Sequence, residues 1–319
     1  MSAVAPGPTT RHARLRWTTK RGRSGDRVLA VLSGVACLLI LAMLVVILAD
    51  IVIGGARTIT WSFLSQPPTD GMTSGGIFPA IFGTAALTLV MTIVAVPAGV
   101  ATAIYLTEYA SSRSRLARLI RVSIANLAGV PSIVFGLFGL GFFISTVGKA
   151  IDNVAYGGRP TYAKPSLVWA ALTLAVLTLP VVVVATEEAL RAVPREIRDA
   201  SLALGATKLQ TIVRVVLPEA LGGILTGSIL AVSRGAGEVA PILFTGAAYY
   251  LPYLPTHMND PFMNLGYHVY ILATQSPDVE RTKPLLYGTV LVLLGLTFLL
   301  NLIAVLLRMR TRRRVRVSL

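Results

Sequence analysis

The chain has 319 residues, of which 54% are hydrophobic and only 13% are charged, and its formal net charge at pH 7 is +15. A water-soluble domain carries about a quarter charged residues, so this composition excludes an ordinary soluble protein and indicates an integral membrane protein. The positive charge does not indicate nucleic-acid binding, because the basic clusters flank apolar segments and do not line a groove with aromatic side chains.

The amino-terminal segment, residues 1–27, begins with Pro, Gly and Thr and then becomes rich in Arg. It holds no apolar residues that could build a core, so we expect a disordered cytoplasmic tail. The basic half of this tail is expected to rest on anionic membrane lipid.

Six apolar segments follow, each long enough for the roughly 20 residues that a transmembrane helix needs. They are residues 28–49, 77–107, 122–147, 166–186, 220–250 and 285–307. The sequence therefore predicts an all-α, polytopic membrane protein with six transmembrane helices. The first helix and an external loop occupy residues 28–76, the main transmembrane domain residues 77–308, and a second basic cytoplasmic tail residues 309–319.

The Lys and Arg residues orient these helices, because cytoplasmic loops of membrane proteins carry an excess of them. Of the 29 in the chain, 22 fall in four segments on one predicted side, residues 1–27, 111–121, 187–219 and 308–319. Both termini are therefore expected in the cytoplasm, as an even number of spans requires.

A polar island, residues 187–218, separates two of the apolar segments. Its charges alternate in sign, and an apolar stripe that includes Leu202 and Leu209 recurs at helical spacing. Gly205 suits a turn between two short helices. Such a cytoplasmic helix-turn-helix can insert into a groove of a partner, and the alternative is a surface helix that only anchors a loop.

Two opposite charges, Arg234 and Glu238, lie inside the fifth apolar segment. Residues four apart share one face of a helix, and charges within a membrane usually mark a substrate or ion pathway. The alternative is a mutually neutralised pair that only fixes helix packing. Pro241, together with two nearby glycines, is expected to weaken the helix at this point.

Several functions find no support in the residues. The chain contains no G-x-x-x-x-G-K-[ST] motif, so it is not expected to bind ATP by that route. His257 and His268 have no third ligand at a suitable spacing, so neither a metal nor another cofactor is expected. A membrane enzyme would need a cluster of titratable groups within the spans, and only Arg234 and Glu238 lie there. A stand-alone secondary transporter or channel would be expected to show duplicated halves, and the sequence shows no such duplication.

The polar island contains a longer pattern, DASLALGATKLQTIVRVVLP at residues 199–218. It resembles the coupling loop of bacterial ABC-importer permeases, which reads Glu-Ala-Ala, three residues, Gly, nine residues, Ile-x-Leu-Pro. Asp replaces Glu, Ser replaces the second Ala and Val replaces Ile. The resemblance implies coupling to a separate ATPase by the following residues: Asp199, Ala200, Ser201, Gly205, Ala206, Leu217 and Pro218.

The segment RGAGEVAPILFTG at residues 234–246 narrows the resemblance to the PstA family of phosphate permeases. The likeness extends over roughly residues 77–308. It implies that phosphate passes Arg234 and Glu238, and that the chain itself catalyses no bond chemistry. The implied partners are two ATPase subunits, a second related permease and an external phosphate-binding protein, in a bacterial inner membrane. Another oxyanion, such as molybdate or sulfate, is the alternative substrate.

Reporter fusions test the predicted topology. Fusions at Lys164 and at Tyr253 should report an external position, and a fusion at Leu319 an internal one, because the Lys and Arg bias fixes the orientation. An external carboxyl terminus would contradict the six-helix arrangement.

Overall fold

The computed structural model describes residues 20–111, 113–276 and 278–317, and the chain divides into two compact units, residues 1–50 and 51–319. Within the described residues, six helices are long and apolar enough to cross a membrane, which confirms the predicted number. They are Gly25–Gly55, Phe78–Tyr109, Ser132–Ala155, Leu167–Arg191, Lys208–Ala236 and Val279–Leu306.

The first unit consists of most of helix α1, Lys20–Gly55. Residues 1–19 of the predicted tail lie outside the described residues. Residues 20–27 were predicted as part of that tail, but they already belong to α1. No proline interrupts this stretch, so its backbone can join the apolar helix that follows.

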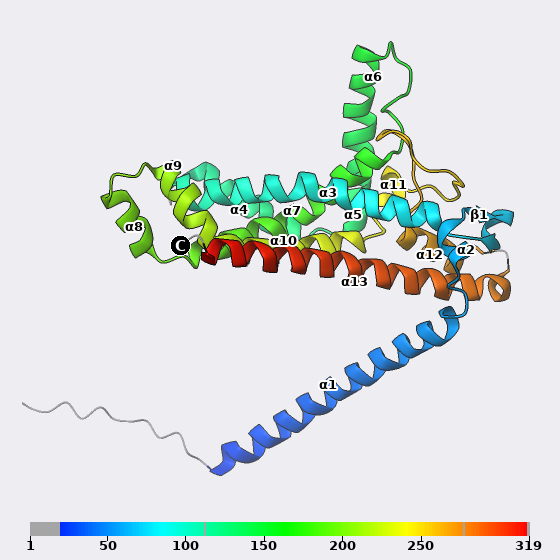
Figure 1. The fold of residues 1–319 in the computed structure, drawn as a ribbon, viewed down its shortest axis with the longest axis horizontal. Coiled ribbons are helices and arrows are strands. Elements are labelled where there is room, and N and C mark those ends of the chain that lie inside the picture. Colours follow the sequence, from blue (N-terminus) through cyan, green and yellow to red (C-terminus); the bar gives the residue numbers. More distant parts are fainter. Residues whose placement is uncertain (1–19, 112, 277, 318–319) are drawn as a thin grey trace, which may run out of the picture. The chain divides into compact units, whose positions relative to one another are not determined.

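Four long helices form the core of the second unit: α3 (Phe78–Ile104), α7 (Leu167–Arg191), α10 (Leu217–Ala236) and α13 (Val279–Val317). Helix α7 packs against both α3 and α10, and α13 packs along α10 (Figure 1). Small residues permit the close approach of these helices. At Gly227, for example, a Cβ atom would overlap the side chain of Ala185 on α7.

Shorter elements complete the second unit. The helices are α2 (Trp61–Ser65), α4 (Arg115–Ala128), α5 (Ser132–Phe138), α6 (Lys149–Ala155), α8 (Arg195–Ala203), α9 (Lys208–Thr211), α11 (Ile242–Thr245) and α12 (Leu265–Thr274). Three π-helical segments, η2 (Tyr105–Tyr109), η3 (Gly139–Gly148) and η4 (Ile212–Val216), and a 3₁₀ turn, η1 (Asp70–Met72), join them. Strands β1 (Pro68–Thr69) and β2 (Ser74–Gly75) pair antiparallel.

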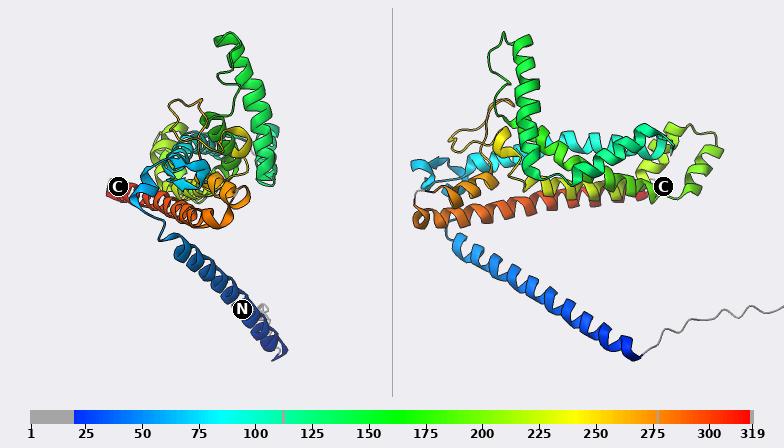
Figure 2. Two further views of the ribbon diagram at one scale, coloured as in Figure 1. Left: turned by 90° about the vertical axis from the view of Figure 1, so that its right-hand side faces the viewer. Right: turned by 180° about the vertical axis from the view of Figure 1, so that it is seen from behind.

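The third predicted span, residues 122–147, is wrong in its bounds. The chain instead forms the amphipathic helix α4, leaves the helical conformation at Gly129–Pro131, and starts a new helix at Ser132 that runs to Ala155. Pro131 explains the break, because a proline disfavours the helical conformation of the residue before it. The α6 end of the new helix projects away from the other helices of the unit in all three views (Figures 1 and 2).

The fifth predicted span, residues 220–250, also ends in a different place. The observed helix runs from Lys208 to Ala236, and the chain resumes a helix only at Ile242. The predicted weak point at Pro241 is therefore a complete break, since proline lacks the N–H that would continue the helix.

The end of the second unit that lies away from α8 is held together by long-range hydrogen bonds. The backbone N–H of Leu265 donates to Thr84 Oγ1 of α3 at 2.9 Å, and the N–H of Ala248 donates to the carbonyl of Phe262 at 2.8 Å. The buried carboxylate of Asp152 accepts from the N–H groups of Tyr162 and Ala163, both at 2.8 Å. These bonds fix the loops around the helices.

The tight contact at Gly83 gives a test of the packing. A Cβ on Gly83 would overlap the backbone carbonyl of Met263, whereas a Cβ on Gly222 of α10 would meet nothing within 4 Å. Overpacking of this kind costs about 1–3 kcal/mol. Gly83→Ala should therefore lower the melting temperature of the detergent-solubilised chain, and the control Gly222→Ala should not. Equal melting temperatures would refute the packing at Gly83.

Candidate coupling turn and intramembrane charge pair

The polar island folds as the predicted helix-turn-helix. Helix α8 ends at Ala203, the chain turns through Gly205, and α9 begins at Lys208. Gly205 has a φ of +85°, which lies in the left-handed region that residues with a Cβ rarely adopt. We call residues 199–207 the coupling turn. Because of this positive φ, the backbone of the turn itself requires a glycine at position 205.

Side chains on both sides of Gly205 make the turn rigid. Thr207 Oγ1 accepts a hydrogen bond from the N–H of Gln210, and Gln210 Oε1 accepts one from the N–H of Thr207, which forms a capping box. Ser201 Oγ and Thr211 Oγ1 lie 2.9 Å apart across the turn. The capping box was not predicted from the sequence, although its Thr-x-x-Gln signature is present at residues 207–210.

The structure separates the predicted coupling residues into two groups. Asp199, Ala200 and Gly205 are exposed on the turn, with Ser201 and Ala206 half-buried beside them. Leu217 and Pro218 instead occupy the first positions of α10, where Leu217 packs on a buried cluster of the helix bundle. The second group therefore seats the helix in the bundle and does not extend the exposed surface.

Apolar side chains are exposed on the coupling turn and on the helix that follows it. Leu204 is 90% exposed and Leu209 is 62% exposed.

Arg198 attaches the coupling turn to the rest of the molecule. Its Nη2 atom donates to the carbonyl of Leu190 at 2.7 Å and to Glu108 Oε1 at 3.1 Å, and its Nη1 atom donates to the carbonyl of Val193. The guanidinium thus binds α8 to the end of α7 and to η2. Both charged side chains are largely buried, and neither was predicted as a site residue.

A second ionic cluster lies next to this attachment. Glu187 on α7 contacts Arg121 Nε at 3.3 Å and Arg191 Nη2 at 2.7 Å. Arg121 also donates to the carbonyl of Leu106 at 2.6 Å. The cluster therefore connects α4, α7 and η2 at the end of the bundle that carries the coupling turn.

The predicted intramembrane pair does form, but with a different local geometry. Arg234 lies in the last turn of α10, whereas Glu238 lies beyond the end of that helix, so the two residues do not share a helical face. Arg234 Nε is 3.7 Å from Glu238 Oε1. The side chain of Arg234 is 65% exposed and that of Glu238 is 22% exposed. The guanidinium is thus open on the surface of this chain.

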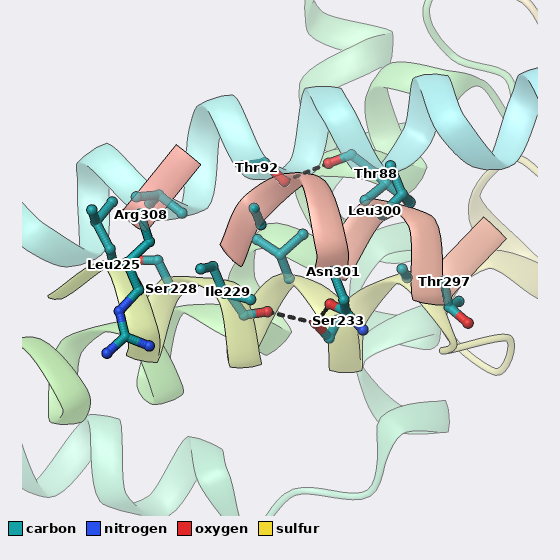
Figure 3. Close-up of a pocket in the computed structure, with 14 residues that line it drawn as sticks. Thr88, Thr92, Leu225, Ser228, Ile229, Ser233, Thr297, Leu300, Asn301 and Arg308 are labelled. Carbon is teal, nitrogen blue, oxygen red and sulfur yellow. Dashed lines mark hydrogen bonds between the residues drawn. The ribbon is translucent and has the colours of Figure 1, made fainter. Parts of the chain in front are cut away.

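A cavity of about 230 Å³ adjoins this segment, between α3, α10 and α13 (Figure 3). Thr88 and Thr92 line it, and their hydroxyls donate to carbonyls of their own helix. Ser233, which precedes Arg234, donates to the carbonyl of Ile229 at 2.7 Å and contacts Asn301 of α13. Asn301 is a polar residue within a span, and it was not predicted as a site residue.

The two histidines lie in different environments. Burial within α12 lowers the pKa of His268 to about 4, so this side chain is neutral at physiological pH. His257 Nδ1 lies 2.9 Å from Thr256 Oγ1. Among the described residues, no group of three His, Cys, Asp or Glu side chains is arranged to hold a metal ion.

Comparison with known families agrees with this arrangement. Residues 95–317 match the family of binding-protein-dependent transport system inner membrane components. The chain belongs to this family. The matched residues include the coupling turn, the charge pair and all the spans from α7 onward.

Individual relatives are similar over most of the chain. The phosphate transport system permease protein PstA 1 of Mycobacterium tuberculosis strain H37Rv is 37% identical over 77% of this chain and 74% of its own. The PstA protein of Yersinia pestis is 33% identical over 88% and 89%. A probable ABC transporter permease protein of Bacillus subtilis, YqgI, is 32% identical over 80% and 86%.

Solved structures show the same fold. A bacterial alginate ABC transporter superposes with a TM-score of 0.66 at 14% identity, over 92% of this chain and 97% of the transporter chain. The inward-facing MetNI methionine ABC transporter superposes with a TM-score of 0.55 at 18% identity, over 73% and 94%. The chain therefore has the fold of an ABC importer permease of type I.

Proposed function

We propose that this chain is the permease subunit of an ATP-driven importer that carries inorganic phosphate across the cell membrane. The observation that carries the proposal is an exposed guanidinium, Arg234, at the end of a membrane-spanning helix in a chain several of whose relatives are phosphate permeases. Two ATPase subunits, a second related permease and an external phosphate-binding protein would complete the transporter. ATP hydrolysis would belong to the ATPases, and this chain would perform no bond chemistry.

The coupling turn is proposed as the contact for an ATPase subunit. Leu204 in the turn and Leu209 just after it are exposed, Gly205 has the left-handed backbone that the turn requires, and Arg198 attaches α8 to the end of α7. An exposed helical tip with apolar anchors fits the helix-in-groove mode of recognition. The helix that starts at Lys208 runs through the π-helical segment η4 to Ala236, so a displacement of the tip would reach Arg234.

The charge pair is proposed to line the phosphate pathway. Phosphate near neutral pH carries one to two negative charges, and an arginine offers planar, bidentate donors to its oxygens. Glu238, at 3.7 Å, would hold the guanidinium when no anion is present and weaken its grip when one is. The anion would then bind well enough to enter and loosely enough to leave.

Substitutions at Gly205 test the coupling turn. Gly205→Asp should abolish phosphate uptake in cells that express the whole importer, while the chain still inserts, because the left-handed backbone and the ATPase contact are both disturbed. Cysteines at Ala206 or Lys208 should cross-link to the ATPase. Gly157→Asp is the matched control, since Gly157 also has a positive φ, of +59°, and open space around it but lies outside the turn. Normal uptake in Gly205→Asp without any cross-link would refute the coupling role.

Neutral substitutions test the charge pair. Arg234→Gln should reduce phosphate uptake by about tenfold or more, since a hydrogen bond to a charged group contributes about 1.5–3 kcal/mol. Glu238→Gln should also slow turnover, by leaving the anion too tightly held. At matched membrane levels, recovery of uptake in the double variant Arg234→Gln with Glu238→Gln would show that the pair only fixes packing.

Competition experiments test the substrate. Sulfate or molybdate should fail to compete with phosphate in the unaltered importer, and competition would favour those alternative substrates.

A further inference from the structure

A second concave site lies at the end of the bundle that carries the coupling turn. It is a cavity of about 640 Å³ formed by η2, by α4, by the end of α7 and by α8. Four arginines and two carboxylates line it: Arg121, Arg191, Arg195, Arg198, Glu108 and Asp199. Because Glu187 contacts two of the arginines from outside the lining, four positive charges face three negative ones.

The arginines differ in how many of their donors are already used. A guanidinium has five N–H donors. Arg198 uses most of its own to hold α8, as described above. Arg121 donates to two partners and Arg191 to one, and within the described residues Arg195 has no hydrogen-bond partner. Three arginines from three different elements therefore retain several free donors around one cavity.

Two uncharged features of the cavity also favour an anion with several oxygens. Thr107 lines the cavity, and its hydroxyl is buried and has no hydrogen-bond partner among the described residues. Helix α8, nine residues long, begins at this cavity with Pro194 as its N-cap and no capping side chain. The N–H groups of its first turn carry a partial positive charge that stabilises an anion.

We propose that this cavity binds a phosphate group, with Arg191 and Arg195 as the principal ligands and Arg121 and Thr107 beside them. A phosphate group presents three or more acceptor oxygens, so it can use donors that converge from several elements. A protein carboxylate has only two oxygens and would leave most of these donors unused.

The phosphate group can come from two sources. One is free phosphate in the adjoining water, and the other is the headgroup of an anionic lipid. The neighbouring helix α4 makes the second source accessible, because its apolar residues Leu116 and Leu119 are 58% and 62% exposed while Arg121 on the same helix lines the cavity. An amphipathic helix of this kind lies at a membrane surface.

Residue-resolved arginine modification tests the site. The full-length chain is placed in nanodiscs of neutral lipid, treated with phenylglyoxal, and the modification rates at Arg191 and Arg195 are measured by mass spectrometry. Inorganic phosphate is compared with chloride at equal ionic strength, and neutral lipid is compared with discs that contain phosphatidic acid. At a ligand concentration near ten times its Kd, both arginines should be modified about tenfold more slowly. Arg159, which does not line the cavity, is the internal control.

The arms of this experiment separate the two sources. Protection by inorganic phosphate in neutral discs identifies free phosphate as the ligand, and protection only in discs with phosphatidic acid identifies a lipid headgroup. Equal protection of Arg159, protection by neither anion, or protection only after the ATPase is added would overturn the proposal. None of these outcomes depends on the role of Arg234, so failure here would leave the proposed transport function standing.

A pair of hydroxyl variants gives a second measurement. Thr107→Val removes the unpartnered hydroxyl. It should lower the affinity of the cavity for the protecting anion by a few-fold to tenfold, because one lost hydrogen bond costs about 0.5–1.5 kcal/mol. Thr102→Val is the matched control, because the hydroxyl of Thr102 already donates to the carbonyl of Ala98 at 2.8 Å. Identical binding by the two variants would exclude Thr107 as a ligand and overturn that part of the site.

Discussion

The rest of the structure depends on one continuous helix, Lys208–Ala236, that joins the coupling turn to the intramembrane arginine. Its 29 residues rise by roughly 43 Å, at about 1.5 Å per residue. The helix is seated against α7 through small residues such as Gly227, where the backbones approach closely. A π-helical segment, Ile212–Val216, interrupts its regular hydrogen bonding near the turn. The two transport roles proposed for this chain, the ATPase contact and the phosphate pathway, lie at opposite ends of this element.

The coupling turn has a second attachment, which runs through side chains. Arg198 binds the carbonyls at the end of α7, so α8 cannot shift without moving α7 or breaking hydrogen bonds to a charged group. The two sides of the turn are thus fixed by different means, Lys208 by continuity of the helix and Arg198 by its guanidinium. Because α7 and α10 also pack against each other, the attachments lead into the same pair of helices.

Local patterns in the sequence predicted the elements but not their junctions. Apolar runs identified six spans because burial in lipid requires length and composition, and a single glycine identified the turn because few residues adopt its backbone conformation. Residues 122–147 were assigned to one span, since apolar composition alone does not show that Pro131 divides them. Contacts such as Arg198 with Glu108 were beyond prediction, because 90 residues separate the partners and no spacing rule relates them.

The continuity of the helix Lys208–Ala236 has a thermodynamic consequence. Where binding at one end of such an element changes the affinity at the other end, the coupling free energy is the same in both directions. Suppose that a partner bound to the coupling turn changes the affinity of Arg234 for an anion by some factor. That anion then changes the affinity of the turn for the partner by the same factor. An anion bound at the far end of the helix would therefore affect subunit assembly as well as being the transported substrate.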